Sequence, residues 1–524
     1  MVLRTIVSAI GLTMRAGRTG QVFTRDELIA AANTKPMGGL LPMRFAGGAV
    51  DSRQVQRGEL FIALRGAQTD GHRYIGAAIR AGAAAVLCQR PDEEAAARGV
   101  PQIIVNDPLD VLQRLANRHL RRQPYTRVIA VTGSNGKTGV KEAVASLLQH
   151  LAPTLKTAGN LNTETGVPLT LLRLNPEHKF AVLEMGAQWV GEISMLCRIA
   201  PPDIAVVTVV GPEHLEFFGS MENVAKAESE AVAALPADGI AILNDDDRAV
   251  RKMAKRTRAR IVTYGHRPIA SVRAQRSGGN TLEGMRFTIT YGNQRSRVHL
   301  NIPGEHAVTT ALAAAGVAVS CGMNLQTIAA GLSELRPVKR RGEIKPAING
   351  ATLVDDTYNA NRQSAIAAIS LLHGATIPEA AKRWFVFGDM LELGKYSHDE
   401  HAAVGKAAAG TIDELVLVGT EVRSTADAAT RAGMPTDRVH LYSANLNDGG
   451  AMSQARLEAA AFVRERIGQG DVVLVKGSLG AGMDAVVAEL QEKRNAGRRQ
   501  SDISARLLQL AAPDTVQSVP ERAN

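Results

Sequence analysis

The sequence predicts an α/β protein made of three domains and flanked by two terminal extensions. The chain has 524 residues, which at roughly 100–200 residues per domain is enough for about three. Short apolar runs of strand length alternate with amphipathic stretches of helix length, a pattern typical of parallel sheets covered by helices. The alternation is interrupted near residues 125 and 336. We therefore expect an N-terminal extension (1–22), domains at 23–125, 126–336 and 337–490, and a poorly ordered basic tail (491–524).

The first domain carries short predicted elements. Strands are expected at Leu60–Leu64 and Ala84–Cys88, on either side of a helix at Ile75–Ala81. The segment RRQPYTR that follows is interpreted as a linker, because Pro124 interrupts a helix.

The central domain alternates strands and helices clearly. Arg127–Val131 is predicted as a strand, and Lys137–Gln149 as a helix with its apolar side chains on one face. The runs KFAVLEMG and DIAVVTVVGPEH are further strands, and their near-continuous hydrophobicity predicts a parallel sheet covered on both faces. A helical region from His306 to Leu335 ends near RPVKRRG, which we interpret as the second boundary.

The third domain repeats the alternation. The runs ATLVDD, RWFVFGDM, ELVLVGT and DVVLVKGS are predicted strands separated by helical stretches. This pattern predicts a second doubly wound sheet.

Composition argues against several classes of protein. The net charge is +10, but the basic residues are scattered and aromatic residues make up only 4%, which indicates solvated faces rather than a nucleic-acid surface. The three cysteines lie far apart, which suits a reducing cytosol. No run reaches the ~18 uncharged apolar residues of a spanning helix, so no membrane insertion is expected. For the N-terminus, a signal or transit peptide is one interpretation and an extra arm the favoured one, since a clear cleavage site is lacking.

A glycine-rich turn between the first strand and helix of the central domain, VTGSNGKT, predicts a phosphate site. Its backbone amides and the positive end of the helix suit phosphate oxygens. The residues concerned are Gly133, Ser134, Asn135 and Gly136. Lys137 is placed to reach the β- and γ-phosphates, and the Thr138 hydroxyl to bind Mg²⁺. The match to the general P-loop is incomplete, since Val131 stands where the first glycine is expected.

Two polar residues follow apolar strands of the same domain. Glu184 ends the run AVLE, and His214 follows VVTVVGPEH. The carboxyl ends of parallel strands form the ligand-binding edge of an open α/β sheet, so both are expected near the phosphate turn. A carboxylate suits Mg²⁺, whereas a histidine is an unusual neighbour for that ion. Taken alone, Glu184 also fits a surface carboxylate and His214 a loop residue.

Together these segments resemble a known family. AVTGSNGKT, GNLNTETGVP, LEMGA, HLEFFGS, DDTYNAN, GDMLELG and LVKGS are similar to motifs of the Mur ligase family, and the resemblance covers residues 23–490. DSRQVQRGELFIAL and DGHRY resemble that family's first domain. The resemblance implies a small N-terminal uridine-nucleotide-binding α/β domain, a central P-loop ATPase-like parallel sheet and a C-terminal Rossmann-like domain.

The resemblance also implies a reaction. The γ-phosphate of ATP is transferred to the terminal carboxylate of UDP-N-acetylmuramoyl-tripeptide, and the amine of D-alanyl-D-alanine attacks the acyl phosphate. DDTYNAN and GDMLELG favour this branch, because branches that add other amino acids usually carry a DYAHxP-like stretch at the first position. ATP and Mg²⁺ are the implied cofactors. A cytoplasmic monomer that makes a peptidoglycan precursor is expected.

By resemblance, Lys137, Glu184 and His214 are catalytic. Thr138 and Glu184 hold one magnesium ion, and Glu184 and His214 touch a second. Residues of the third domain face the nucleotide or the dipeptide. They are Asp356 and Asn359 for the nucleotide, and Tyr358, Asn361 and Lys476 for the substrate.

Further substrate contacts are expected in two polar turns. Ser52 and Arg53 suit the uridine diphosphate, because a guanidinium binds phosphate bidentately. Asn160, Asn162 and Thr163 suit the muramoyl part. The alternatives are a turn with an exposed arginine and a turn capped by its own side chains.

Glu228 departs from the family pattern. Many members carry a lysine fourteen positions after His214, and its carbamate supplies a carboxylate near the second magnesium; here that position is Glu228. Three interpretations are open: Glu228 binds the metal directly, Lys226 takes the role, or Glu228 is an exposed helix residue. The first is favoured, because Mg²⁺ prefers oxygen ligands.

Three other departures concern nucleotide and dipeptide contacts. Ala307 stands where an asparagine often contacts adenine, Arg362 where proline is common, and Leu479 where an arginine is frequent. Arg362 is a candidate to replace the missing charge at Leu479. Other functions to be distinguished are a different amino-acid ligase of the family, a P-loop ATPase coupled to partner binding, and a nucleic-acid-binding protein.

Overall fold

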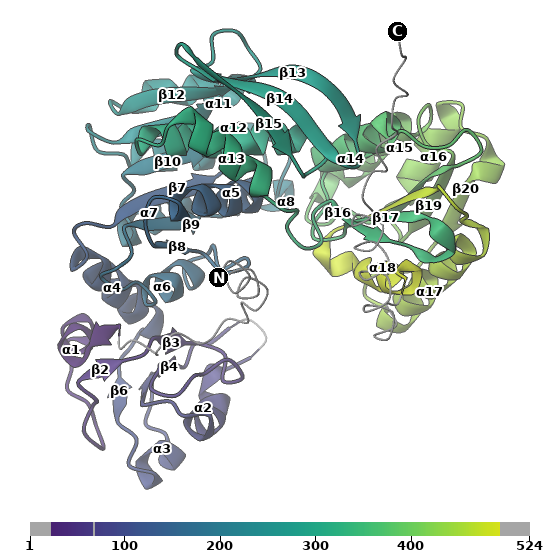
Figure 1. The fold of residues 1–524 in the computed structure, drawn as a ribbon. Coiled ribbons are helices and arrows are strands. Elements are labelled where there is room, and N and C mark those ends of the chain that lie inside the picture. Colours follow the sequence, from purple (N-terminus) through teal and green to yellow (C-terminus); the bar gives the residue numbers. More distant parts are fainter. Residues whose placement is uncertain (1–21, 67–68, 493–524) are drawn as a thin grey trace, which may run out of the picture.

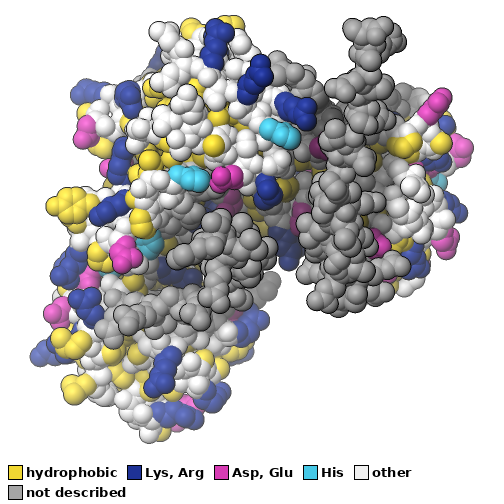
Figure 2. All heavy atoms as spheres, viewed as in Figure 1, with side chains coloured by type: hydrophobic (Ala, Val, Ile, Leu, Met, Phe, Trp, Pro, Cys, Tyr) yellow, Lys and Arg dark blue, Asp and Glu magenta, His cyan; other side chains and the backbone are white. Residues whose placement is uncertain are grey.

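The computed structural model describes residues 22–66 and 69–492. The predicted N-terminal arm or targeting segment and almost all of the basic tail lie outside these residues, as do residues 67–68. Three α/β blocks follow one another along an arc, with the central block between the other two (Figure 1). The predicted α/β fold class is confirmed. On the face shown in Figure 2, Lys and Arg side chains are dispersed among acidic and apolar ones.

The first block contains two small sheets. Strands β3, β4, β5 and β6 form a parallel sheet in that order, and β1 pairs antiparallel with β2. The helix predicted at Ile75–Ala81 is observed with those bounds. The elements are β1 (Phe23–Thr24), α1 (Arg25–Ala32), β2 (Arg44–Phe45), β3 (Gly48–Ala49), β4 (Leu60–Ile62), α2 (Ile75–Ala81), β5 (Ala85–Cys88), α3 (Glu93–Ala97), β6 (Gln102–Ile104) and α4 (Pro108–Arg121).

The central block is built on a nine-stranded sheet of order β15-β14-β13-β12-β11-β10-β7-β9-β8. The elements before the edge hairpins are β7 (Arg127–Thr132), α5 (Lys137–Gln149), β8 (Thr154–Lys156), α6 (Gly166–Leu171), β9 (Phe180–Glu184), α7 (Glu192–Ile199), β10 (Ile204–Val207), α8 (Leu215–Phe218), α9 (Met221–Glu228), α10 (Glu230–Ala233), β11 (Ile240–Asn244), α11 (Arg248–Lys252) and β12 (Arg260–Gly265). The elements that follow are β13 (Val272–Thr281), β14 (Gly284–Tyr291), β15 (Gln294–Leu300), α12 (Glu305–Ser320) and α13 (Leu325–Glu334).

The two faces of this sheet bury alternate residues of each strand. Ile129 and Val131 of β7 pack in one core with α5, α12 and α13. Val128 and Ala130 of the same strand pack in another core with α6, α7 and α10. The seven strands β7–β13 are joined by parallel pairings, but β14 and β15 add two antiparallel pairings at the edge that the sequence analysis did not predict.

The third block is a six-stranded sheet of order β16-β17-β21-β18-β19-β20, parallel except at β16. Helices α14, α15 and α16 cover one face, and α17 and α18 the other. The elements are β16 (Glu343–Pro346), β17 (Thr352–Asp356), α14 (Arg362–Gly374), β18 (Arg383–Gly388), α15 (Ser397–Ala408), β19 (Glu414–Val418), α16 (Arg423–Arg431), β20 (Val439–Tyr442), α17 (Gly449–Arg466), β21 (Val472–Lys476) and α18 (Asp484–Leu490).

The first and central blocks share one apolar core. It runs from Phe23 through Leu112 of α4 to Leu171 and Ala181 of the central block. No sheet crosses residues 125/126 or 336/337 within the described chain. We therefore propose domain boundaries at these two positions, because each sheet lies wholly on one side of them. The first boundary does not divide the apolar core, which the first and central blocks share.

Candidate active site

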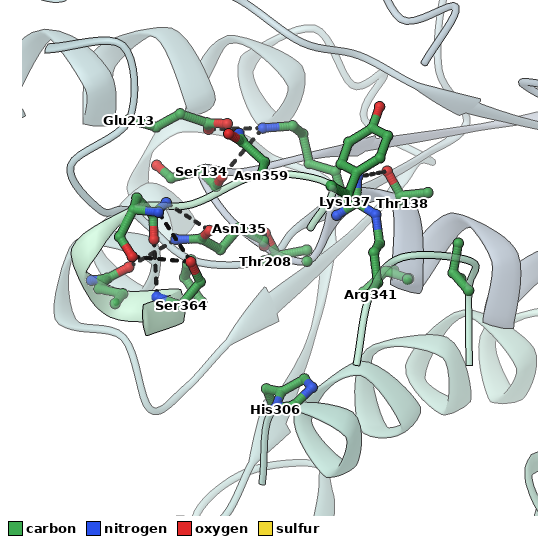
Figure 3. Close-up of a pocket in the computed structure, with 18 of the residues that line it drawn as sticks. Ser134, Asn135, Lys137, Thr138, Thr208, Glu213, His306, Arg341, Asn359 and Ser364 are labelled. Carbon is green, nitrogen blue, oxygen red and sulfur yellow. Dashed lines mark hydrogen bonds and ion pairs between the residues drawn. The ribbon is translucent and has the colours of Figure 1, made fainter. Parts of the chain in front are cut away.

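A cavity of about 860 Å³ lies between the central and third blocks. Its walls come from the turn before α5, the ends of β9 and β10, the start of α12, the connection to the third block, and turns after β17, β18 and β21. These turns follow the carboxyl ends of strands from two parallel sheets, which is where open α/β sheets bind ligands. Figure 3 shows how side chains from both blocks meet there.

Two glycines shape the phosphate turn. Gly133 has φ +123°, and a Cβ there would lie 2.1 Å from Thr208 Oγ1. Gly136, at φ +83°, begins α5. The turn is held against the segment after β10, because Ser134 N–H donates to Val209 O at 2.8 Å. Glycine is therefore required at 133 both for its backbone angle and for the close approach.

The ammonium of Lys137 is surrounded by acids. Its Nζ donates to Gly133 O at 2.7 Å and to Glu213 Oε2 at 2.8 Å (Figure 3). Burial acts to lower the pKa of Lys137, but the carboxylates of Glu213, Glu228 and Glu184 outweigh it and raise that pKa. Glu213, next to His214, was missed by the sequence analysis.

Thr138 and Glu184 form the next part of the site. Thr138 Oγ1 donates to Glu184 Oε2 at 2.9 Å, and Asn162 Nδ2 donates to Glu184 Oε1 at 2.9 Å. Lys141, which is fully buried, lies 3.6 Å from Glu184 Oε2 and was also missed. The structure thus brings three of the predicted residues together and adds a second buried lysine.

His214 lies at the contact with the third block. Its Nδ1 contacts the Glu392 carboxylate, and its Nε2 is 3.7 Å from Glu213 Oε1. His214 and Glu392 both have left-handed backbones, at φ +51° and +61°. Glu216 N–H donates to Glu392 O at 3.2 Å, so the turn after β18 is fixed to α8.

Glu228 is buried below the phosphate turn, with 3% of its surface exposed. Its Oε2 accepts a 2.6 Å hydrogen bond from Thr132 Oγ1. Burial raises the pKa of Glu228 to about 7, against the opposing effect of Lys137. The interpretation of Glu228 as an exposed helix residue is therefore wrong, whereas Lys226 is exposed to solvent.

The third block contributes a group of linked side chains. Lys476 Nζ donates to Asp356 Oδ2 at 2.6 Å and to Asn359 O at 2.8 Å. Asn361 accepts from Ser364 N–H at the start of α14, and its Nδ2 donates to Asn135 Oδ1 of the phosphate turn at 2.7 Å. These predicted residues therefore face the phosphate turn across the cavity.

Arg341 is a further site residue, and the sequence analysis treated its segment only as a boundary. Its guanidinium donates to Thr138 Oγ1 at 3.0 Å and lies over the Tyr358 ring, 3.9 Å from the centroid. Its buried Nε has no hydrogen-bond partner among the described residues. The preceding Arg340, at φ +63°, fixes the segment through hydrogen bonds to Thr357. A partly buried guanidinium with one unpaired N–H beside a phosphate turn fits an anionic ligand.

Of the remaining predicted residues, some lie away from the cavity and others line it. Ser52 and Arg53 follow β3, away from the cavity, where Arg53 pairs with Asp51 at 2.7 Å. Asn160 and Thr163 line the cavity. Arg362 pairs with Glu400 at 3.0 Å, so its charge is already neutralised by another partner.

The oxygen donors of the cavity suit a magnesium ion that also binds phosphate and water, and not a metal ion held by protein side chains alone. Within residues 22–66 and 69–492, no group of three or more His, Cys, Asp or Glu side chains is arranged to hold a metal. The hydroxyl of Thr138 and the carboxylate of Glu184 are nevertheless adjacent oxygen donors. Mg²⁺ typically takes one or two carboxylates and completes its shell with phosphates and water. These residues are therefore compatible with a magnesium–nucleotide complex.

The chain is similar to known proteins along most of its length. Models described as the Mur ligase middle domain, the Mur ligase glutamate ligase domain and the Mur ligase family catalytic domain match residues 131–318, 340–479 and 45–120. The UDP-N-acetylmuramoyl-tripeptide–D-alanyl-D-alanine ligase of Escherichia coli is 37% identical over 446 residues, covering 84% of this chain and 93% of the relative.

Two solved structures are similar along most of the chain. MurF from Acinetobacter baumannii has a TM-score of 0.78 and 29% identity, covering 90% of this chain and 99% of the other. MurF from Thermotoga maritima, in complex with ADP, has a TM-score of 0.70 and 27% identity, covering 84% and 96%.

Proposed function

The chain belongs to the Mur ligase family, and from that premise we propose that it joins D-alanyl-D-alanine to UDP-N-acetylmuramoyl-tripeptide. ATP is consumed, and UDP-N-acetylmuramoyl-pentapeptide, ADP and phosphate are released. The relatives at 37% identity that cover most of the chain carry the name of this activity. The observation that carries the proposal is the meeting of Lys137 and Thr138 with Arg341 from the third block in one cavity.

The chemistry requires two anions to be held together. A carboxylate is a poor acyl donor until one of its oxygens becomes a better leaving group. Transfer of the γ-phosphoryl group to the peptide carboxylate releases ADP and gives an acyl phosphate. The dipeptide amine then attacks the carbonyl carbon, the amide bond forms, phosphate leaves and the nitrogen loses its proton.

Each group in the cavity has a place in this scheme. The turn of residues 133–137 holds the phosphates through its backbone, and Lys137 neutralises the transferred group. Arg341, which comes from the third block and donates to Thr138, binds the same phosphate. Asp356, Asn359 and Lys476 orient the nucleotide or dipeptide, together with Tyr358 and Asn361. The hydrogen bond from Asn361 to Asn135 supports this, since it joins the third block directly to the phosphate turn.

We assign magnesium to Thr138 and Glu184, with His214 and Glu228 nearby. When bound, Mg²⁺ supplies charge neutralisation and alignment of phosphate oxygens. The carboxylates of Glu213, Glu228 and Glu184 near Lys137 support this assignment, because a triphosphate that binds among them needs further positive charge.

The proposal also covers location and assembly. The described helices include none that is both long and apolar enough to cross a bilayer. Free cysteines at 88, 197 and 321 support a reducing compartment, so we place the enzyme in the cytoplasm. That it acts as a monomer is a separate part of the proposal. Ser52 and Arg53 remain proposed contacts of the uridine diphosphate, and Asn160, Asn162 and Thr163 of the muramoyl part.

A three-substrate assay tests the function. ADP release is measured with ATP, UDP-N-acetylmuramoyl-tripeptide and D-alanyl-D-alanine, and then with each component omitted. Rapid release and pentapeptide product are expected only when all three are present. Release without the dipeptide would instead favour a P-loop ATPase, and activity with single amino acids a different ligase of the family.

Glu228 is expected to supply the carboxylate near the second magnesium, so that no carbamylated lysine is needed. Glu228→Gln removes the buried charge at nearly constant volume and is expected to lower kcat about 10–100-fold, as for other groups that support a metal site. Lys226→Ala is the matched control and is expected to stay within twofold of wild type, with or without added CO₂. A large loss in Lys226→Ala, or a carbamate on Lys226 in the mass of the intact protein, would contradict this assignment.

A further inference from the structure

One of the two tryptophans of the chain is exposed beside the cavity. Trp384 is 1% exposed and belongs to the core of the third block. Trp189 is 52% exposed and lies between β9 and α7, in the connection that follows Glu184. An exposed indole next to a cavity is a candidate contact for a ligand, because it offers a large, rigid apolar surface with a polar N–H.

The backbone that carries Trp189 is fixed. Glu192 Oε2 accepts from Gln188 N–H at 2.6 Å and from Trp189 N–H at 3.0 Å. Glu230 of α10 accepts from Gly191 N–H at 2.7 Å and from Ser194 N–H at 2.8 Å. Two carboxylates thus satisfy four amides of this turn, and the ring is presented from a pre-organised backbone, which lowers the entropy cost of binding.

A second aromatic ring lies against Trp189. The ring centroids of Trp189 and Phe217 are 5.5 Å apart, and the planes are inclined by 60°. Phe217 lies in α8, three residues after His214. We call this pair the aromatic rim. It joins the two connections that carry Glu184 and His214.

The rim lies next to the cavity wall, although Trp189 and Phe217 do not themselves line the cavity. Ala187, Gln188 and Glu192, on both sides of Trp189 in the chain, line the cavity, and so does His214. Gly186 N–H donates to Asn162 O at 3.0 Å, so the turn that holds Asn160, Asn162 and Thr163 adjoins this connection. We consider a substrate with its carboxylate at Thr138 and the rest of the molecule extending past Asn162. Such a substrate lies close to the rim.

We propose that the aromatic rim binds the muramoyl-peptide part of the UDP-linked substrate. This inference rests on the proposed function and extends it to a subsite. The N-acetylmuramoyl ring presents C–H groups on its faces and carries a lactyl methyl group, and these apolar surfaces pack on an indole while the hydroxyl groups stay in water. The nucleotide is the less suitable occupant, because its phosphates are held on the Lys137 and Arg341 side of the cavity.

Intrinsic fluorescence provides a direct test. UDP-N-acetylmuramoyl-tripeptide, added without ATP and dipeptide, is expected to change the emission of the wild-type protein, because Trp189 loses contact with water while Trp384 is buried throughout. Trp189→Phe is expected to abolish the change. A response that persists in Trp189→Phe, or that appears with D-alanyl-D-alanine alone, would overturn the proposal.

Kinetics provide the second readout. Trp189→Ala is expected to raise KM for UDP-N-acetylmuramoyl-tripeptide about tenfold, with kcat and KM for ATP within twofold of wild type. Trp189→Phe, which keeps a ring, is expected to restore KM to within about threefold. Leu457→Ala, at an exposed apolar position on α17, is the control and should change nothing.

The two proposals fail in different ways. If the wild-type protein forms no pentapeptide product, the function is wrong. If it forms product and Trp189→Ala keeps a wild-type KM for the UDP-linked substrate, only the rim assignment is wrong. Should Trp189→Ala unfold at a lower temperature, Phe217→Leu and the wild-type fluorescence titration still decide the question.

Discussion

Lys137→Ala is expected to slow pentapeptide formation at least about a thousandfold. Removal of one well-placed donor from a transition state costs about 10²–10³ in rate, and Lys137 also supplies the only charge of the phosphate turn itself. Its loss also leaves Glu213 and Glu228 without their nearby cation. The measurement is the initial rate of ADP release with all three substrates at saturation.

The controls for Lys137 separate chemistry from folding. Lys406→Ala removes an exposed lysine of α15 and is expected to leave the rate unchanged. Thermal unfolding of Lys137→Ala shows whether the fold persists. A folded Lys137→Ala protein that forms the product at the wild-type rate would disprove the proposed role of the phosphate turn.

Arg341→Ala is expected to lower kcat about a hundredfold or more. Arginines that reach a transferred phosphate from a second structural element contribute about 10³–10⁵ in other phosphoryl-transfer enzymes, which makes the expected loss a conservative one. Arg341→Lys is not expected to rescue the rate, because an ammonium does not reproduce the planar guanidinium that stacks on Tyr358 while it donates to Thr138.

The measurement for Arg341 compares kcat, which is expected to fall, with KM, which is not. KM for UDP-N-acetylmuramoyl-tripeptide is expected to stay within about twofold, because the proposed uridine contacts lie in the first block. Arg431→Ala, an exposed arginine of α16, serves as the control. Retention of wild-type kcat in Arg341→Ala would show that its contact with Thr138 serves structure alone.

Local patterns predicted the phosphate turn well. The helix at Lys137–Gln149 was predicted with its observed bounds, because glycine precedes it and its apolar residues recur with helical spacing. The strands before Glu184 and His214 were equally clear, since parallel strands buried on both faces are continuous apolar runs. Sequence alone therefore placed these residues at one edge of one sheet.

The edge of the central sheet was missed although the sequence contained evidence for it. The run GMRFTITY alternates apolar and polar residues, and Gly292 and Asn293 separate it from β15. Such a dipeptide between alternating runs is typical of a hairpin. The burial of Glu228 also had a basis in the sequence, because Val224 and Ala231 lie on the same helical stripe.

Contacts between blocks had no such basis. Arg341 and Thr138 are 203 positions apart, and no periodicity relates them. The same holds for Asn361 with Asn135 and for His214 with Glu392. Their pairing depends on how two separately folded sheets meet, which propensity and spacing do not encode.

The shared core of the first two blocks has a mechanical consequence. Parting them would expose Phe23, Leu112 and Leu171 to water, whereas water can replace hydrogen bonds between the central and third blocks, such as Arg341 to Thr138 and Asn361 to Asn135. We therefore expect the first and central blocks to move as one unit and the third block to move relative to them. Since the cavity lies between the central and third blocks, we expect the products to leave when these two blocks separate.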